Sequence, residues 1–254
     1  MVECTGLENQ RGSHLRGFES LFLRKEFLEI GTLFCLWHIF AIKKNMSIIE
    51  KLKWRYATKK FDTTKKLSKN QINTLKQAFN LTALSYGLQT LKLVVVEDKL
   101  KREQLVQHSY GQRQVIDSSH LLVICIQKEI NDEDVDYHFN IIKEIRQTPD
   151  EILDPFKKGL KSTIQSMTKI KKNDWATRQA YIALGNLMTV CAMEHIDSCP
   201  MEGFVAEQVD EVLELDKYGL TSVLLFPVGF RAKDDMFASL KKVRKPLSET
   251  TIEI

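Results

Sequence analysis

Three short apolar runs, far apart in the chain, constrain the fold more than any other feature of this 254-residue sequence. They cover Leu91–Glu97, Leu121–Gln127 and Ser222–Val228, and the first is rich in β-branched residues. Runs without strict apolar–polar alternation are typical of strands that are buried on both faces. Helical patterns separate the three runs, so the sequence predicts an α+β or α/β domain in which helices cover a sheet.

Several shorter helices are predicted around these strands. The clearest follows Ser68, where apolar residues recur at a spacing of three and four and the serine hydroxyl is placed to cap the helix. The first helix is expected to start at Ile48 and to end near Arg55. The other short helices are expected over residues 100–108 and 205–215, with loops over residues 84–89 and 198–204.

The long helix predicted from Asp174 is unusual. From Ala180 to Met193 it is apolar on nearly every side, and Asn186 is the main exception. A helix of this kind is buried either in a core or in a subunit interface. Before it, residues 131–172 are charged and mostly helical, with breaks expected at Pro149 and Pro155. The tail, residues 250–254, has strand propensity but no strand close to it in sequence.

The first 45 residues do not resemble the rest of the chain. Their one apolar stretch, Ile30–Ile42, is shorter than the roughly 20 residues that a membrane-spanning helix needs. Three interpretations remain open: a segment upstream of the usual start at Met46, a targeting or membrane-associating segment, or a packed extension. We therefore divide the chain into an atypical extension, 1–45, and a domain, 46–254.

Charge and cysteine usage narrow the functional classes. A formal net charge of +4 is too small and too dispersed to indicate nucleic-acid binding. The five cysteines form no CxxC pair, which favours a reducing cytoplasm over a disulfide framework or a zinc ribbon. No stable membrane association is expected. The best candidate for a metal site is the acidic run Asp132, Glu133, Asp134, Asp136 and His138. This pattern is more typical of the solvated start of a helix than of a metal site.

Two basic clusters are candidates for a phosphate site, because arginine offers a planar fork and lysine a point charge to phosphate oxygens. One is Arg55 with Lys59. The other is the run 241–245, which includes Lys242 and Arg244. Each cluster is also compatible with an ordinary solvated surface, and their separation in sequence does not show whether they meet.

Six segments, in the same order along the chain, resemble the FMN-dependent nitroreductase family. The first is Arg55-Tyr56-Ala57-Thr58-Lys59-Lys60-Phe61-Asp62, which is similar to the opening motif of that family. Together the segments span 46–254 almost end to end, and they are most similar to the oxygen-insensitive NAD(P)H nitroreductase and dihydropteridine reductase group. The remaining segments are 84–89, 111–120, 200–204, 227–229 and 242–244.

This resemblance implies a nitroreductase-like α+β fold, with a central mixed sheet flanked by helices. It also implies an intertwined homodimer with an exchanged C-terminal strand and two FMN sites at the interface. The implied activity is ping-pong electron transfer from NAD(P)H, through tightly bound FMN, to small-molecule acceptors such as nitroaromatics, quinones or dihydropteridine. The flavin carries the hydride chemistry, so no side-chain catalyst is implied. The alternatives are a non-catalytic flavin-binding or flavin-fragmenting relative and a basic-surfaced helical interaction protein.

The resemblance also carries over to individual residues. Arg55, Lys242 and Arg244 match ligands of the FMN phosphate, and Lys59 matches a cation at the pyrimidine edge, where it would stabilise negative charge on the reduced flavin. Tyr56 and Ala57 stand where relatives often have His and Ser, so one hydroxyl contact to the phosphate is missing. The other positions implied to face the flavin are Gln112, Gln114, Met201, Glu202 and Gly203 in the same subunit, and Ser85, Tyr86, Gly87 and Gln89 from the partner subunit.

Overall fold

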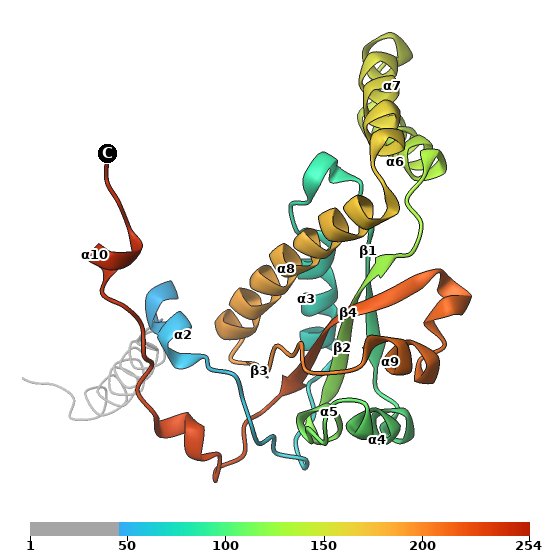
Figure 1. Ribbon diagram of the computed structural model, residues 1–254. Helices are drawn as coiled ribbons and strands as arrows, with labels where there is room; N and C mark the ends of the chain where they lie inside the picture. Colours follow the sequence, from blue (N-terminus) through green and yellow to red (C-terminus); the bar gives the residue numbers. More distant parts are fainter. Residues whose placement is uncertain (1–45) are drawn as a thin grey trace, which may run out of the picture. The chain divides into compact units, whose positions relative to one another are not determined.

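A computed structural model describes residues 46–254, and Ile48–Ile254 form one compact unit. The extension predicted over residues 1–45 lies outside the described part. Within that unit the strands form one four-stranded sheet in the order β1-β2-β4-β3 (Figure 1). Their bounds are β1 Leu91–Val96, β2 His120–Gln127, β3 Asp197–Ser198 and β4 Leu220–Gly229.

The three strands predicted from the apolar runs are all present, as β1, β2 and β4. All the ladders of the sheet are antiparallel, and an isolated bridge between Ala57 and Ser198 adds a parallel pairing. The short strand β3 and a bridge between Met201 and Leu225 lie where the sequence predicted only a loop. They escaped prediction because two residues and a single bridge carry no apolar periodicity.

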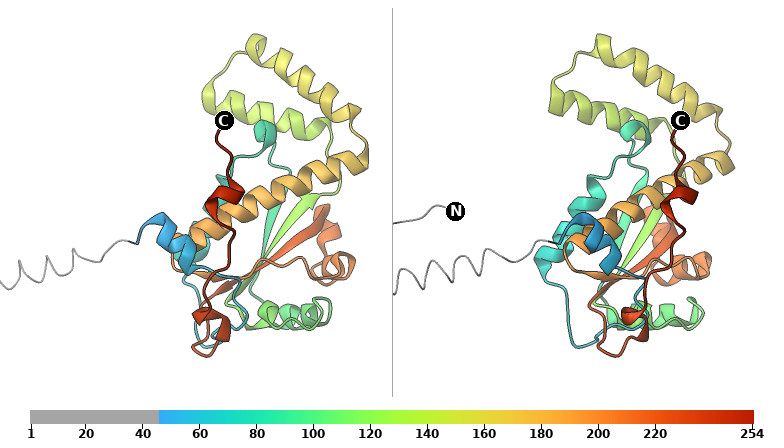
Figure 2. Two further views of the ribbon diagram at one scale, coloured as in Figure 1. Left: turned by 60° about the vertical axis from the view of Figure 1, so that its left-hand side comes forward. Right: turned by 90° about the vertical axis from the view of Figure 1, so that its left-hand side faces the viewer.

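Both faces of the sheet are covered by helices, which explains why β2 shows no alternation (Figure 2). Leu122 and Ile124 belong to one apolar core with α3 and α8, whereas Leu121 and Val123 belong to a second core with α4, α5 and α9. The helices are α2 Ile48–Trp54, α3 Lys69–Asn80, α4 Lys99–Gln107, α5 Gln114–Asp117, α6 Asp132–Arg146, α7 Asp150–Ser166, α8 Lys169–Met193, α9 Ala206–Val212 and α10 Leu247–Thr250.

Helix caps account for several helix ends. Ser68 caps α3 as predicted, and the side chain of Gln71 completes a capping box. The prediction that the long helix begins at Asp174 is wrong, because α8 begins at Lys169. The side chain of Thr168 accepts a hydrogen bond from the backbone N–H of Lys171 and starts the helix one turn earlier. The first turn of α8 holds only one apolar residue, the exposed Ile170, so it carries no apolar periodicity.

The two prolines between α6 and α8 have different effects. Pro149 precedes α7, and the break predicted there is confirmed. The break predicted at Pro155 is wrong, because this residue lies inside α7. A proline at that position removes one intrahelical bond, to the carbonyl of Glu151. Glu151 and Pro155 are both exposed, so water can solvate that carbonyl and the helix continues.

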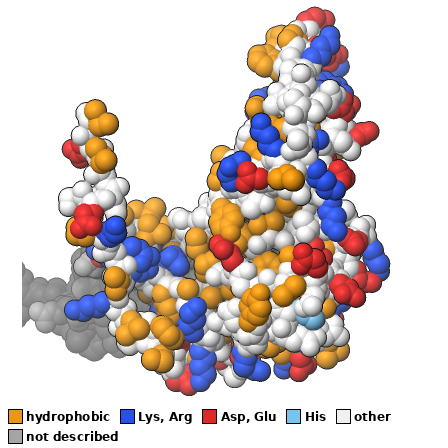
Figure 3. Space-filling model, in the orientation of Figure 1, with side chains coloured by type: hydrophobic (Ala, Val, Ile, Leu, Met, Phe, Trp, Pro, Cys, Tyr) orange, Lys and Arg blue, Asp and Glu red, His pale blue; other side chains and the backbone are white. Residues whose placement is uncertain are grey.

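One side of α8 and the end of the chain remain exposed. Tyr181 and Ile182 lie in the apolar stretch of α8, yet their side chains are 42% and 53% exposed. Hydrophobic side chains gather over this part of the molecule (Figure 3). The tail predicted as a strand, residues 250–254, begins at the last residue of the short helix α10, and residues 251–254 pair with no strand of the described chain. Within residues 46–254, no helix combines the length and apolar character needed to cross a membrane.

Candidate functional site

A basic cavity of about 410 Å³ lies where the C-terminal segment passes α2. Its lining includes Arg55, Lys242 and Arg244, and basic side chains gather on this part of the surface (Figure 3). The structure therefore brings together the two basic clusters that the sequence left apart. Tyr56, Ala57 and Lys59 line the same cavity.

Lys242 joins the two ends of the domain. Its ammonium donates a hydrogen bond to the carbonyl oxygen of Leu52, 3.0 Å away, and another to the carbonyl oxygen of Arg55. Leu52 lies in the last turn of α2, where backbone carbonyls have no partner within the helix. A cation at this end also interacts favourably with the helix dipole.

Three of the six basic residues that line the cavity, Arg55, Lys242 and Arg244, repel one another. Burial lowers the pKa of Arg55, and the charge of Arg244 lowers it further. The pKa of Lys242 is lowered by burial and then by Arg55 and Arg244. The Nε of Arg55 is buried without a hydrogen-bond partner. Among the described residues no carboxylate forms an ion pair with any of these three side chains, so the cavity suits an anion.

Asp235 connects the Arg55–Lys60 motif to the C-terminal segment. Its Oδ2 accepts hydrogen bonds from the backbone N–H groups of Lys59 and Lys60, at 3.0 and 3.1 Å, and from the hydroxyl of Tyr56, at 2.8 Å. Its Oδ1 accepts one from the backbone N–H of Phe237 at 3.1 Å. Burial alone would raise the pKa of Asp235, but these hydrogen bonds outweigh burial and lower it.

Arg231 fixes the aromatic side chains beside the cavity. Its guanidinium carbon lies 4.2 Å from the ring centroid of Trp54 and 4.5 Å from that of Tyr56. Its backbone N–H and its Nε donate to the buried carboxylate of Asp197 at 2.8 and 2.6 Å. Sequence reasoning missed Asp235, Arg231 and Asp197, because no local pattern links these residues to a motif more than 130 positions away.

A second group of predicted residues lies next to the cavity. The backbone N–H of Thr58 donates to the carbonyl of Ser198 at 3.1 Å, which places the segment around Lys59 beside β3 and the residues that follow it. Gln112 Nε2 donates to the carbonyl oxygen of Gly203 at 3.0 Å. A Cβ on Gly203 would lie 2.9 Å from that nitrogen, so a side chain at this position would have to displace the Gln112 amide.

The remaining residues of this group lie along the same segment. Met201 is buried and forms a β-bridge with Leu225, which leaves Glu202 exposed beside Gly203. Gln114 is buried in the first turn of α5, two residues from Gln112. These contacts place the segment around Lys59 beside β3, and the segment that follows β3 carries Met201, Glu202 and the Gln112–Gly203 contact.

The predicted loop at residues 85–89 lies elsewhere. The backbone N–H of Ser85 donates to Gln179 Oε1 at 2.9 Å, and the ring of Tyr86 lies 6.2 Å from that of Trp175. Gln89 Nε2 donates to the carbonyl of Asn80. The contacts of Ser85 and Tyr86 are made with the first half of α8, and that of Gln89 with the end of α3.

The basic cavity adjoins the other end of α8, where Lys51 binds the carbonyl of Met193. Fourteen residues from Gln179 to Met193 extend about 21 Å along a helix. Within one chain, the loop at residues 85–89, including Gly87, therefore does not reach the basic cavity.

The acidic run considered for a metal lies at the start of α6. Asp136 forms ion pairs with Lys157 and Lys161, at 2.7 and 2.8 Å, and Asp134 accepts from Gln127. Within the described ranges, no group of three or more His, Cys, Asp or Glu residues could hold a metal ion. Cys125, Cys191 and Cys199 are buried free thiols.

Comparison with known proteins identifies the family. The model of the nitroreductase family matches residues 52–230. A Staphylococcus aureus protein named as an NAD(P)H nitroreductase is 32% identical over 202 residues, which cover 75% of this chain and 89% of that protein. A Staphylococcus haemolyticus protein of the same name is 33% identical over 217 residues, which cover 82% of this chain and 96% of that protein.

Solved structures agree at the level of the fold. A Bacillus subtilis protein described as a nitroreductase superposes with a TM-score of 0.73 at 23% identity, over 81% of this chain and 98% of that one. An Exiguobacterium sibiricum protein, described as a nitroreductase in complex with FMN, superposes with a TM-score of 0.71 at 19% identity, over 82% of this chain and 98% of that one. The predicted α+β fold is confirmed, and the chain belongs to the nitroreductase family, which is named for an oxidoreductase activity.

Proposed function

We propose that this protein is an FMN-dependent oxidoreductase that uses NAD(P)H to reduce nitroaromatic, quinone or dihydropteridine acceptors. The convergence of Arg55, Lys242 and Arg244 on one cavity carries this proposal. The cavity fits the FMN phosphate, because a phosphate would relieve the repulsion among the three cations and give the buried Nε of Arg55 an acceptor. Ala57 supplies no hydroxyl at this site.

The residues beside the cavity suit the flavin ring. Lys59 would place a positive charge at the pyrimidine edge, and Gly203 allows the backbone to approach closely because it has no Cβ. Gln112, held by the carbonyl of Gly203, and Gln114 would border the same ring, together with Met201 and Glu202. When bound, FMN would supply two-electron transfer in a ping-pong cycle, in which nucleotide and acceptor use the same open face in turn.

A second copy of the chain would complete the site. The loop at Ser85–Gln89 lies far from the cavity of its own chain, so it can reach a flavin only in a partner. The exposed apolar residues Tyr181 and Ile182 on α8 offer a surface for that partner. Burial raises the pKa of Tyr181, and the carboxylate of Glu202 raises it further, so Tyr181 lies beside Glu202.

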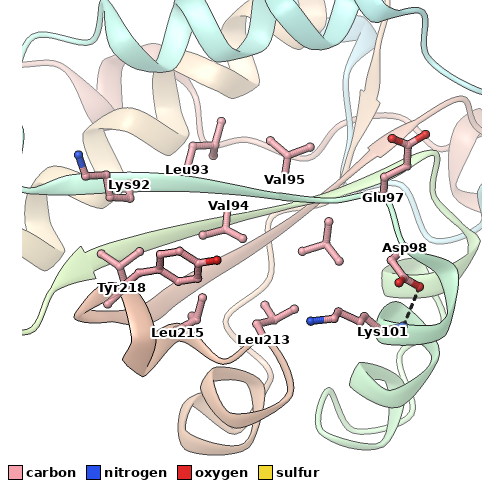
Figure 4. A pocket seen from close by; sticks show the side chains of 12 residues that line it. Lys92, Leu93, Val94, Val95, Glu97, Asp98, Lys101, Leu213, Leu215 and Tyr218 are labelled. Carbon is pink, nitrogen blue, oxygen red and sulfur yellow. Dashed lines mark hydrogen bonds between the residues drawn. The ribbon is translucent and has the colours of Figure 1, made fainter.

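The edge of the sheet can receive the partner's tail. Among the described strands β1 pairs only with β2, so its other edge has free backbone groups. A groove of about 580 Å³ runs along β1, between the strand and Leu213, Leu215 and Tyr218 (Figure 4). The tail begins with extended backbone at Thr251 (φ −133°, ψ 135°), a conformation that suits strand pairing.

The direct test is an absorbance spectrum of the purified protein, before and after anaerobic addition of NADH or NADPH. We expect flavin absorbance, its loss on addition of one of the two nucleotides, and its return when nitrofurazone is added. A colourless protein that does not take up FMN would overturn the proposal. A flavin that neither nucleotide reduces would instead identify a non-catalytic flavin-binding relative.

A further inference from the structure

A second basic cavity, of about 470 Å³, lies between α4, α5 and the segment that precedes α3. It shares no lining residue with the cavity assigned to FMN. Seven of its eight lining residues are polar or charged, so its occupant must be polar. Its charged residues are Lys66, Lys99, Arg102, Glu103, Arg113 and Asp117.

Arg102 is the unusual residue of this cavity. Only 1% of its surface is exposed, although arginine is almost never fully buried without a paired charge. Its Nη1 donates to the carbonyl oxygen of Ser118 at 2.8 Å, but its Nε is buried with no hydrogen-bond partner. The carboxylates of Glu97, Asp98 and Asp117 partly offset the burial that lowers its pKa, but none of them forms an ion pair with it.

The other cations add positive charge beside Arg102. Lys66 Nζ donates to the carbonyl of Ser119 at 3.3 Å; burial, Arg102 and Lys99 lower the pKa of Lys66, and Glu97 raises it. Of the two lining carboxylates, Asp117 is engaged by Arg113, through hydrogen bonds of 2.9 and 3.2 Å. Glu103 is exposed on the rim. Two lysines and a buried guanidinium therefore line the cavity without an ion-pair partner among the described residues.

We propose that this second cavity binds the phosphate group of a small molecule. A phosphate monoester carries a charge of about −1.5 to −2 at neutral pH and three acceptor oxygens, enough for the Nε of Arg102 and both ammonium groups. The planar guanidinium and the two lysines are the donors typical of phosphate sites. The same chemistry is offered by free phosphate and by a nucleotide phosphate ester. This site is additional to the proposed FMN site.

The test uses calorimetric titration of FMN-loaded protein, in which the first cavity is occupied, at matched ionic strength in chloride. The probes are inorganic phosphate and adenosine 2′-monophosphate. We expect saturable binding of one equivalent. Similar affinity for the two probes would indicate free phosphate as the ligand, and about tenfold tighter binding of the ester would indicate a nucleotide.

Variants locate the binding. The double variant Lys66→Gln/Lys99→Gln should weaken it at least tenfold, because each lysine contributes a charge-assisted contact. The control Lys69→Gln/Lys158→Gln removes two exposed lysines that do not line the cavity and should change affinity less than twofold. Arg102 stays in place, because its replacement would also remove the bond to Ser118.

Two results would overturn the proposal. One is the absence of saturable binding for both probes. The other is binding that persists in the Lys66/Lys99 variant but is lost in Lys242→Gln, which would place the phosphate in the first cavity. If the protein takes up no FMN, the proposed function fails, but the same variants still decide whether the second cavity binds phosphate.

Discussion

At the scale of single residues, the candidate site is a set of like charges held together by the fold. Arg55 and Lys242 have lowered pKa values because they are partly buried beside each other and beside Arg244. This arrangement is unfavourable without an anion, because desolvation and repulsion by the other cations both destabilise the charged form of each side chain. Binding an anion there should therefore stabilise the folded protein by mass action.

Replacing Arg244 by Ala tests the phosphate assignment. The change removes one charge-assisted contact, worth about 1.5–3 kcal/mol, so FMN affinity should fall about tenfold to a hundredfold with the fold intact. The matched control is Lys245→Ala, because Lys245 is the next residue, is equally exposed and does not line the cavity. Equal FMN dissociation constants for the two variants, measured by flavin fluorescence, would contradict the assignment.

Lys59 should affect the potential of the bound flavin as well as its affinity. A cation at the pyrimidine edge favours the negatively charged reduced form, so Lys59→Ala should lower the two-electron midpoint potential by about 20–60 mV, the equivalent of one charge-assisted hydrogen bond. The control is Lys60→Ala, since Lys60 already forms an ion pair with Asp234. A redox titration that gives the same potential for both variants would exclude this role.

At the scale of elements, the site depends on attachments between segments that carry no catalytic group. Asp235 holds the Arg55–Lys60 motif against the C-terminal segment, and Gln179 holds the turn Ser85–Gly87 against α8. Each attachment is a buried or half-buried hydrogen bond between distant parts of the chain. Such bonds contribute modestly when formed but are costly to leave unmade.

Asp235→Asn should loosen the first attachment. At neutral pH the loss of charge-assisted hydrogen bonds should lower the free energy of unfolding by about 1.5–3 kcal/mol and weaken FMN binding. The pKa of Asp235 is lower in the folded protein than its ordinary value of 3.8. Its contribution is therefore fully present above pH 3.8 and is lost as the pH falls through the lowered folded value.

The difference in stability between the native protein and Asp235→Asn should accordingly shrink in acid below pH 3.8, as followed by urea unfolding at a series of pH values. Asp234→Asn is the control, because Asp234 is exposed and forms only an ion pair with Lys60. Equal losses of stability in the two variants would show that Asp235 has no special role.

The turn at Ser85–Gly87 depends on glycine. Gly87 has φ +71°, and an added Cβ would lie 3.1 Å from the His138 ring. Gly87→Ala should therefore lower the free energy of unfolding by about 1–2 kcal/mol. Gly159→Ala is the matched control, because it lies within α7 with open space around it and should raise stability by about 0.5–1 kcal/mol. Urea unfolding of both variants checks the opposite signs.

At the scale of the whole molecule, the described domain has surfaces that a single chain leaves incomplete. The apolar side of α8, the free edge of β1 and the extended tail are exposed at the same time. Obligate homodimers bury such surfaces, in interfaces larger than the standard of about 1,600 Å². Dimerisation and flavin binding should therefore be linked.

Deleting residues 246–254 should weaken both together. A finer variant is Ile252→Pro, which blocks strand pairing because proline has no N–H, and its control is Ile252→Val, which keeps strand propensity. Analytical ultracentrifugation with flavin absorbance detection should show flavin-free monomer for the deletion and for the proline variant. A flavin-loaded, well-folded monomer at micromolar concentration would contradict the dimer proposal.

Much of the fold was predictable from sequence because its signals are local. The strands β1, β2 and β4 appear as apolar runs, and the Ser68 cap acts within four residues of itself. The family motif at residues 55–62 also lies in one segment, so its resemblance could be recognised without a structure. The start of α8 was missed, because the Thr168 cap precedes a turn that carries no apolar periodicity.

By itself, the sequence determined the strands β1, β2 and β4 and most helices, since these depend on neighbours within one or two helical turns. It also supplied the phosphate candidates, as two separate basic clusters in segments that resemble the family. Only the tertiary structure decided that Lys242 meets Arg55 across 187 residues, that Asp235 joins the same two segments, and that the guanidinium of Arg102 is buried in a second basic cavity. These contacts depend on how the sheet and helices pack, because residues so far apart in the chain become neighbours only when both faces of the sheet are covered.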